Sequence, residues 1–185
     1  MDFHDLQAPG LEMALASAST PEAQGPRLYT FIASTGQEDR NKNIFDADGW
    51  ELGNYMKNPI VLENHNWAGL PIGAAVKVWT EQQRLQATIR FADTPRAREV
   101  QALIDQGILR TMSVGHVPLQ AEVRRDSQGW PIGMHSHRQE LVELSITSVP
   151  ANPDAIRIAA LMASGPEVDP AAAEIIAAIR AVRTP

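Results

Sequence analysis

The chain has 185 residues, which is enough for one domain with a substantial core. It carries 22 acidic and 16 basic residues, for a net charge of −6. This negative charge, and the absence of a Lys/Arg block, argue against nucleic acid as a partner. No apolar run is long enough to span a bilayer, and acidic residues stand at the start where a secretory signal needs basic ones, so we expect a soluble protein of a cytoplasm with no membrane contact. The absence of cysteine excludes disulfides, thiolate metal sites and a cysteine nucleophile, so that any nucleophile must be a hydroxyl.

Three parts are expected along the chain. Residues 1–26 are rich in Ala, Ser, Pro and Gly with little periodicity, which is typical of a flexible arm. Residues 27–163 carry the apolar patterns of one domain. Residues 164–185 are expected to form a linker and an amphipathic helix, because apolar side chains recur there at helical spacing: Ile175, Ile176, Ile179 and Val182.

Strands dominate the first half of the expected domain. Residues 84–91 alternate apolar and polar side chains, which indicates a strand with one buried face. Three further strands are predicted from apolar and β-branched residues, at 27–34, 59–62 and 72–79.

One interior helix is expected from Thr94, an N-cap followed by Pro95, to the break at Gly107. Two more strands are predicted at 108–123 and 130–148, with a turn at 124–129 between them and a short helix at 154–162. Because short strands outnumber helices and no βαβ rhythm appears, we expect an α+β fold, mostly an antiparallel β-barrel surrounded by a few helices.

A hydroxyl nucleophile needs a base to take its proton and a third group to orient that base. Histidine is the usual base, and His65 lies among polar residues where an apolar strand ends. Ser113 lies inside a strand, two residues before Gly115, which we interpret as allowing a substrate to approach the backbone. Taken alone, such a histidine is more often a surface loop residue, and such a serine is more often a small residue on the solvent-facing side of a strand.

The third residue stays open at this point. Glu140 and Glu143 are three apart and are therefore expected on opposite faces of a strand, and His135 and His137 lie nearby in the sequence. The same two histidines, with His65 and His116, offer a rival hypothesis of a metal protein, but their spacing matches no familiar ligand pattern. We therefore expect no metal and no cofactor.

Three blocks in this order, at 49–65, 112–115 and 143–153, resemble those of the prohead serine proteases of tailed phages. The resemblance spans about Leu28 to Ala155. It implies the barrel shared with herpesvirus assembly proteases. This sequence differs from the family pattern at His116, where the family often has an aromatic residue.

The resemblance implies His65 as base, Ser113 as nucleophile and Glu143 as the residue that orients the base. Glu140 remains an alternative third member, and so does His137, because the herpesvirus relatives use a second histidine. Donors to the developing oxyanion are expected from one of two pairs: the backbone at Val114 and Gly115, or the side chains of Arg124 and Arg125.

The resemblance also implies a serine endopeptidase that cleaves scaffold and major capsid protein, and itself, during maturation of the viral prohead. It would act inside the prohead, in the host cytoplasm, and a homodimer or higher oligomer is compatible with it. The alternative within the same fold is a non-catalytic scaffold or assembly chaperone, against which the presence of His65, Ser113 and Glu143 argues.

Overall fold

The structure, a computed structural model, describes residues 27–161. The expected N-terminal arm and the expected linker and C-terminal helix lie outside the described residues. In the order of the chain the elements are β1 (Leu28–Thr35), β2 (Ile44–Phe45), the 3₁₀ turn η1 (Ala47–Gly49), β3 (Trp50–Glu51), the 3₁₀ turn η2 (Tyr55–Lys57), β4 (Ile60–Glu63), β5 (Gly73–Glu81), β6 (Arg84–Phe91), α1 (Pro95–Asp105), β7 (Thr111–Arg125), β8 (Pro131–Thr147) and β9 (Arg157–Leu161).

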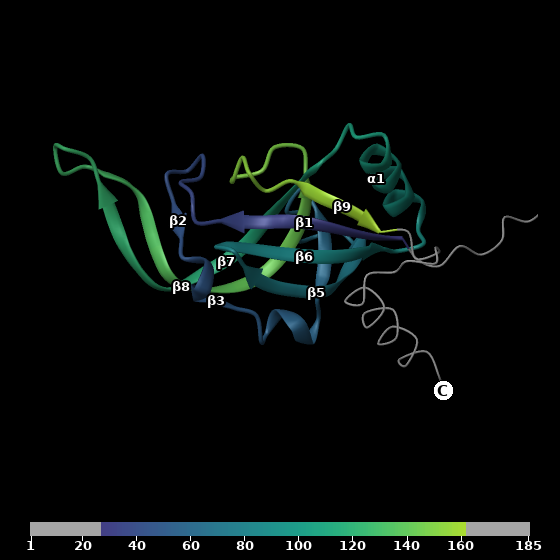
Figure 1. Ribbon diagram of the computed structural model, residues 1–185, viewed down its shortest axis with the longest axis horizontal. Helices are drawn as coiled ribbons and strands as arrows, with labels where there is room; N and C mark the ends of the chain where they lie inside the picture. The colour runs from purple at the N-terminus through teal and green to yellow at the C-terminus, as the bar shows by residue number, and fades with distance from the viewer. Residues whose placement is uncertain (1–26, 162–185) are drawn as a thin grey trace, which may run out of the picture.

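The strands of the described region form one curved, nine-stranded sheet (Figure 1). Its main order is β2-β8-β4-β5-β6-β1-β9, and β3 and β7 also pair with β8. This confirms the expected mostly β fold, and one α-helix, where a few were expected, is present within residues 27–161. A closed barrel is not confirmed, since the strand order does not form a ring, although an isolated bridge joins Thr111 to Ile156.

Strand β8 pairs with four other strands of the sheet. It pairs antiparallel with β7 along one edge, and parallel with β2, β3 and β4 along the other. The distal part of the β7–β8 hairpin extends past the rest of the sheet, at the left of Figure 1. Because β8 touches strands from both halves of the chain, side chains distant in sequence meet along it.

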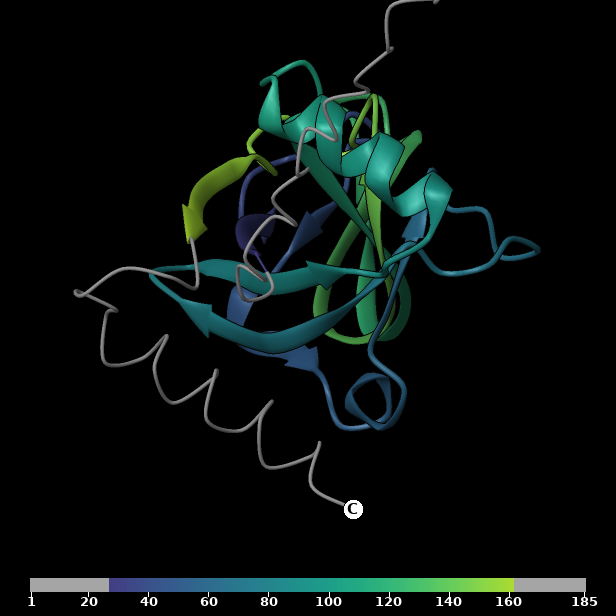
Figure 2. The ribbon, with the colours of Figure 1, turned by 90° about the vertical axis from the view of Figure 1, so that its right-hand side faces the viewer.

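Helix α1 forms as expected. The Thr94 hydroxyl accepts a hydrogen bond from the Ala97 N–H, and Gly107, with a φ of 71°, ends the helix in the left-handed region that suits glycine. Figure 2 shows α1 lying across one end of the curved sheet. It buries Ala97, Val100 and Ile104 in the apolar core, which also includes Tyr29, Phe31, Val61, Leu85, Ile89, Met112, Leu144 and Ile146.

The prediction of a short helix at 154–162 is wrong. Residues Arg157–Leu161 form β9, which pairs antiparallel with β1. Strand β1 pairs with β6 on its other side, so its free edge offers backbone hydrogen bonds that outweigh the weak local helical preference of an Ala-rich segment.

Within residues 27–161, no helix combines the length and the apolar character needed to cross a membrane.

Candidate active site

His65 lies immediately beyond β4, in a strained turn. Both Asn64 and His65 have positive φ values, 48° and 56°, which are uncommon for residues other than glycine and which cluster at functional sites. Two hydrogen bonds to β8 hold this turn: the Asn64 N–H donates to the Ile146 carbonyl at 2.9 Å, and the His65 N–H donates to Ser145 Oγ at 3.1 Å. The backbone of His65 is thus fixed against the strand that carries Glu143.

The carboxylate of Glu143 connects His65 to Ser145. Glu143 Oε1 lies 2.5 Å from His65 Nδ1, and Glu143 Oε2 accepts a 2.6 Å hydrogen bond from Ser145 Oγ. Glu143 is 2% exposed and Ser145 is fully buried. A carboxylate that is buried to this degree needs such partners. With Nδ1–H donating to Glu143, neutral His65 keeps its lone pair on Nε2, the arrangement that a general base requires.

Charge around Glu143 sets the protonation of its neighbours. The hydrogen bond that His65 donates to Glu143 raises the pKa of His65 above its usual value, and partial burial opposes this only in part. Burial, and then the negative charge of Glu143, raise the pKa of the Tyr55 phenol. Tyr55 therefore stays neutral, and its hydroxyl donates to the Ile60 carbonyl at 2.8 Å.

Gly115 makes room for Glu143. The two residues are opposite each other in the β7–β8 register, and a Cβ added at Gly115 lies 2.6 Å from Glu143 Oε1 and 2.8 Å from its Cγ. The sequence interpretation gave this glycine a role in substrate approach. The structure shows a different reason for it, because the side chain of Glu143 lies directly over the glycine.

Ser113 and His65 line one cavity, of about 180 Å³. Its wall also includes Val114 and His116 from β7, and Asn152 from the loop that follows β8. Ser113 is 3% exposed and is opposite Ser145 in the register. The cavity therefore brings together Ser113 and His65, two of the three sequence-predicted catalytic residues. The third, Glu143, contacts His65.

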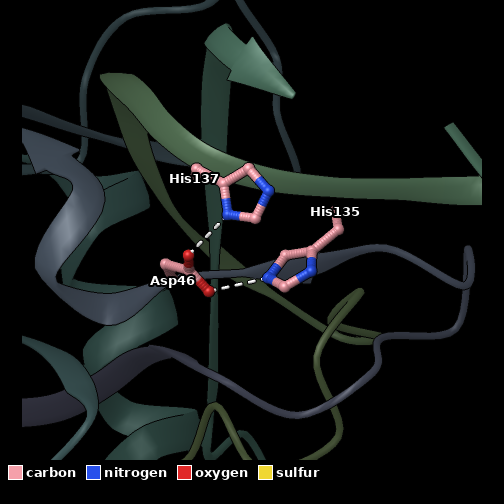
Figure 3. Close-up of side chains that lie close together, drawn as sticks. All are labelled: Asp46, His135 and His137. Atoms are coloured by element: carbon pink, nitrogen blue, oxygen red, sulfur yellow. Dashed lines mark hydrogen bonds and ion pairs between the residues drawn. The ribbon is translucent and has the colours of Figure 1, made fainter. Parts of the chain in front are cut away.

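The other two candidates for the third residue have different partners. Glu140 accepts a 2.9 Å hydrogen bond from Asn54 Nδ2. His137 Nδ1 bonds to Asp46 Oδ2 at 2.8 Å, and Figure 3 shows its ring pointing toward that carboxylate. Of the three candidates, Glu143 is the one that contacts His65.

The expectation that Glu140 and Glu143 face opposite sides of the strand is wrong. Gly115 pairs with Glu143, while the next residue on β7, His116, pairs with Leu141. A β-bulge at Val142 therefore adds one residue to β8, and it places both glutamates opposite positions 115 and 117, on one face. Distance along the strand, and not the face, separates Glu140 from His65.

The candidate oxyanion donors fall in two places. Val114 lines the cavity beside Ser113, and Gly115 follows it. Arg124 and Arg125 lie in the distal hairpin, where Arg124 binds Glu38 at 2.8 Å and Arg125 donates to the Gly129 carbonyl. Neither arginine lines the cavity.

His116 takes the place of the aromatic residue that the family often has. Its ring lies edge-on to Phe45, with centroids 4.5 Å apart, and to Trp50 at 6.3 Å. Burial lowers the pKa of His116, so that it is a neutral, aromatic part of the cavity wall.

The four histidines of the metal hypothesis do not form one set. His65 binds Glu143 and His116 packs on Phe45, whereas His135 and His137 share Asp46.

Sequence reasoning missed Ser145, whose hydroxyl contacts both the backbone of His65 and the carboxylate of Glu143. The available signal was its position two residues from Glu143, on the same face of the strand.

Known proteins resemble this chain in sequence. Residues 56–166, more than half of the chain, match the family described as caudovirus prohead serine proteases. The prohead protease of Escherichia phage T5 is 29% identical over 148 residues, covering 78% of this chain and 68% of that protein. The crystal structure of KSHV protease in complex with a hexapeptide phosphonate inhibitor has a TM-score of 0.49 at 12% identity, covering 85% of this chain and 78% of that one.

The matched segment contains His65, Ser113 and Glu143, and the proteins of this family are peptidases of the serine class. The chain belongs to the caudovirus prohead serine protease family.

Proposed function

We propose that the chain is a serine endopeptidase in which Ser113 attacks the peptide carbonyl, His65 accepts its proton and Glu143 orients His65. The observation that carries this proposal is the short contact between His65 Nδ1 and Glu143 at the same cavity that Ser113 lines. This contact leaves Nε2 as the nitrogen that accepts the proton from Ser113 and returns it to the leaving amine. The backbone N–H groups at Val114 and Gly115 are the proposed oxyanion donors.

The proposed substrates are the scaffold and major capsid proteins of the prohead, cleaved inside the particle in the host cytoplasm. Support comes from the family and from the prohead protease of phage T5. Because the enzyme is enclosed at high concentration with extended segments, it also cuts its own ends, within 8–26 and at 163–166. Assembly into a homodimer or higher oligomer is compatible with this function.

The test is labelling by a fluorophosphonate, which modifies an activated serine. Wild-type protein is expected to react, and Ser113→Ala and His65→Ala are expected not to. Ser34→Ala is the matched control, since Ser34 is a second buried serine that lines the same cavity, and it should label like wild type. Labelling of Ser113→Ala at the wild-type rate would exclude Ser113 as the nucleophile.

Intact mass then tests the substrates in the same set of proteins. After co-expression with the cognate capsid protein, wild type should shorten that protein and its own ends, while Ser113→Ala leaves both full length. A wild type that labels poorly and cuts nothing, yet is required for heads to assemble, would favour the non-catalytic scaffold instead.

A further inference from the structure

A second cluster of polar side chains lies at the base of the β7–β8 hairpin. His135 Nε2 bonds to Asp46 Oδ1 at 2.7 Å, and His137 Nδ1 bonds to Asp46 Oδ2 at 2.8 Å. Figure 3 shows both imidazoles converging on the one carboxylate. One potential ligand atom from each of the three residues lies within 4.8 Å of the other two.

The backbone fixes this convergence. His135 and His137 are two apart on β8 and so share a face. The Asp46 N–H donates to the carbonyl of Ser136, the residue between them, at 2.9 Å. The Asp46 carbonyl accepts from Gln139 Nε2 at 2.9 Å. Asp46 is thus held on both sides of its Cα, with its carboxylate between the two rings.

We propose that Asp46, His135 and His137 bind a divalent transition-metal ion of the Zn²⁺ type. Imidazole and carboxylate ligands suit Zn²⁺, with bond lengths of about 2.0–2.2 Å. In a tetrahedral site these lengths place ligand atoms about 3.3–3.5 Å apart. The present separations of 2.7 and 2.8 Å therefore need to open by about 0.5–0.8 Å, which is within the reach of side-chain rotation.

Glu122 on β7 completes the arrangement on the far side of the rings. Its Oε1 lies 3.9 Å from His135 Nδ1 and 3.8 Å from His137 Nε2, the two nitrogens that do not face Asp46. Ring nitrogens opposite the metal commonly donate to a carboxylate, which fixes the tautomer and strengthens the ligand. At these separations Glu122 makes no hydrogen bond to either ring, and a movement of about 1 Å brings its carboxylate within hydrogen-bonding distance.

Charge and access also fit a dication. Asp46 supplies one carboxylate to the ligand set, and Glu122 adds a second beside the rings. The three ligand side chains are 28–45% exposed, so an ion reaches them from solvent. Three protein ligands leave a tetrahedral ion one more position, for water or a partner's side chain.

The bound ion would join the segment after β2 to β8. Phe45, the neighbour of Asp46, lines the cavity that contains Ser113. The ion would therefore stiffen both the cavity wall and the base of the hairpin, without taking part in the reaction at Ser113.

Titration calorimetry of full-length protein, purified without a metal-affinity tag, tests the site with Zn²⁺ as the probe. We expect one ion per chain, no competition from Mg²⁺, and a melting temperature about 5–10 °C higher at free Zn²⁺ 100-fold above Kd. His137→Asn and Asp46→Asn should each weaken binding at least 100-fold, and Glu122→Gln about 10- to 100-fold.

His65→Asn is the matched control, a histidine outside the cluster, and it should bind Zn²⁺ like wild type. The visible spectrum of Co²⁺ bound to wild type gives a readout that does not depend on variants folding, since a four-coordinate site absorbs strongly and Zn²⁺ should abolish that absorption. Absence of saturable binding, or an equal loss in His65→Asn and His137→Asn, would overturn the proposal.

Discussion

Replacing Gly115 by alanine perturbs the proposed catalytic residues without removing any of them. The new Cβ lies 2.6 Å from Glu143 Oε1, about 0.8 Å short of the 3.4 Å at which ordinary contact begins. Glu143 cannot yield freely, because His65 and Ser145 hold its two oxygens at 2.5 and 2.6 Å. Either Glu143 moves away from His65 or β7 moves away from β8.

Both responses are costly. Overpacking of this kind usually costs about 1–3 kcal/mol, which corresponds to a melting temperature roughly 2–12 °C lower for a chain of this size. A shift of about 0.8 Å stretches the His65–Glu143 contact from 2.5 Å to about 3.3 Å, beyond hydrogen-bonding length for a charged pair. Since misplacement by about 1 Å reduces catalysis about 100-fold, we expect labelling of Ser113 to slow by about 10- to 100-fold.

The assay is the rate of fluorophosphonate labelling, with thermal unfolding measured on the same samples. Gly53→Ala is the matched control, because Gly53 is exposed and a Cβ there meets nothing within 4 Å. If Gly115→Ala labels within twofold of wild type and melts at the same temperature, the inference that Gly115 exists to make room for Glu143 is wrong.

Further predictions concern the partners of His65. Because Glu143 raises the pKa of His65 and the base must be neutral, labelling should rise with pH through a midpoint above 6.5, and a profile that is flat from pH 5 to 8 would contradict His65 as base. Glu143→Gln should move this midpoint to lower pH and slow labelling by about 10³- to 10⁴-fold, whereas Glu140→Gln, which loses only a contact with Asn54, should stay within twofold. Ser145→Ala leaves a buried oxygen of the Glu143 carboxylate without its donor, so it should lower the free energy of unfolding by about 1–3 kcal/mol, measured in urea. An unchanged urea midpoint would show that another group replaces the hydroxyl.

Elements whose signals are local were predictable from the sequence. The alternation at 84–91 gave β6, and the N-cap at Thr94 with the break at Gly107 gave α1. The helix expected at 154–162 failed because β9 depends on the free edge of β1, more than 120 positions earlier in the chain. The parallel pairing of β4 with β8 was unpredictable for the same reason, since strand order is a property of the whole sheet.

The site shows the same division between local and distant information. Periodicity indicated that Glu143, Ser145 and Thr147 share a face, and all three are buried. It could not separate Glu143 from Glu140, because the bulge at Val142 changes the alternation between them. A bulge has no signal in the hydrophobic pattern of one sequence, so the choice between the glutamates came from the family resemblance and not from the residues.

One strand carries two separate polar sites because its parallel neighbours change along its length. Between Leu144 and Glu140, β8 changes neighbour from β4 to β3, and further back to β2. Two of these short parallel partners are followed by a polar residue that contacts β8: His65, after β4, contacts Glu143, and Asp46, after β2, contacts His135 and His137. Asp46 continues the β2 register beside His137, whereas the turn at Asn64 and His65 brings the His65 ring back to Glu143. These contacts join residues 78 and about 90 positions apart, which is why neither set could be assembled from spacing along the chain.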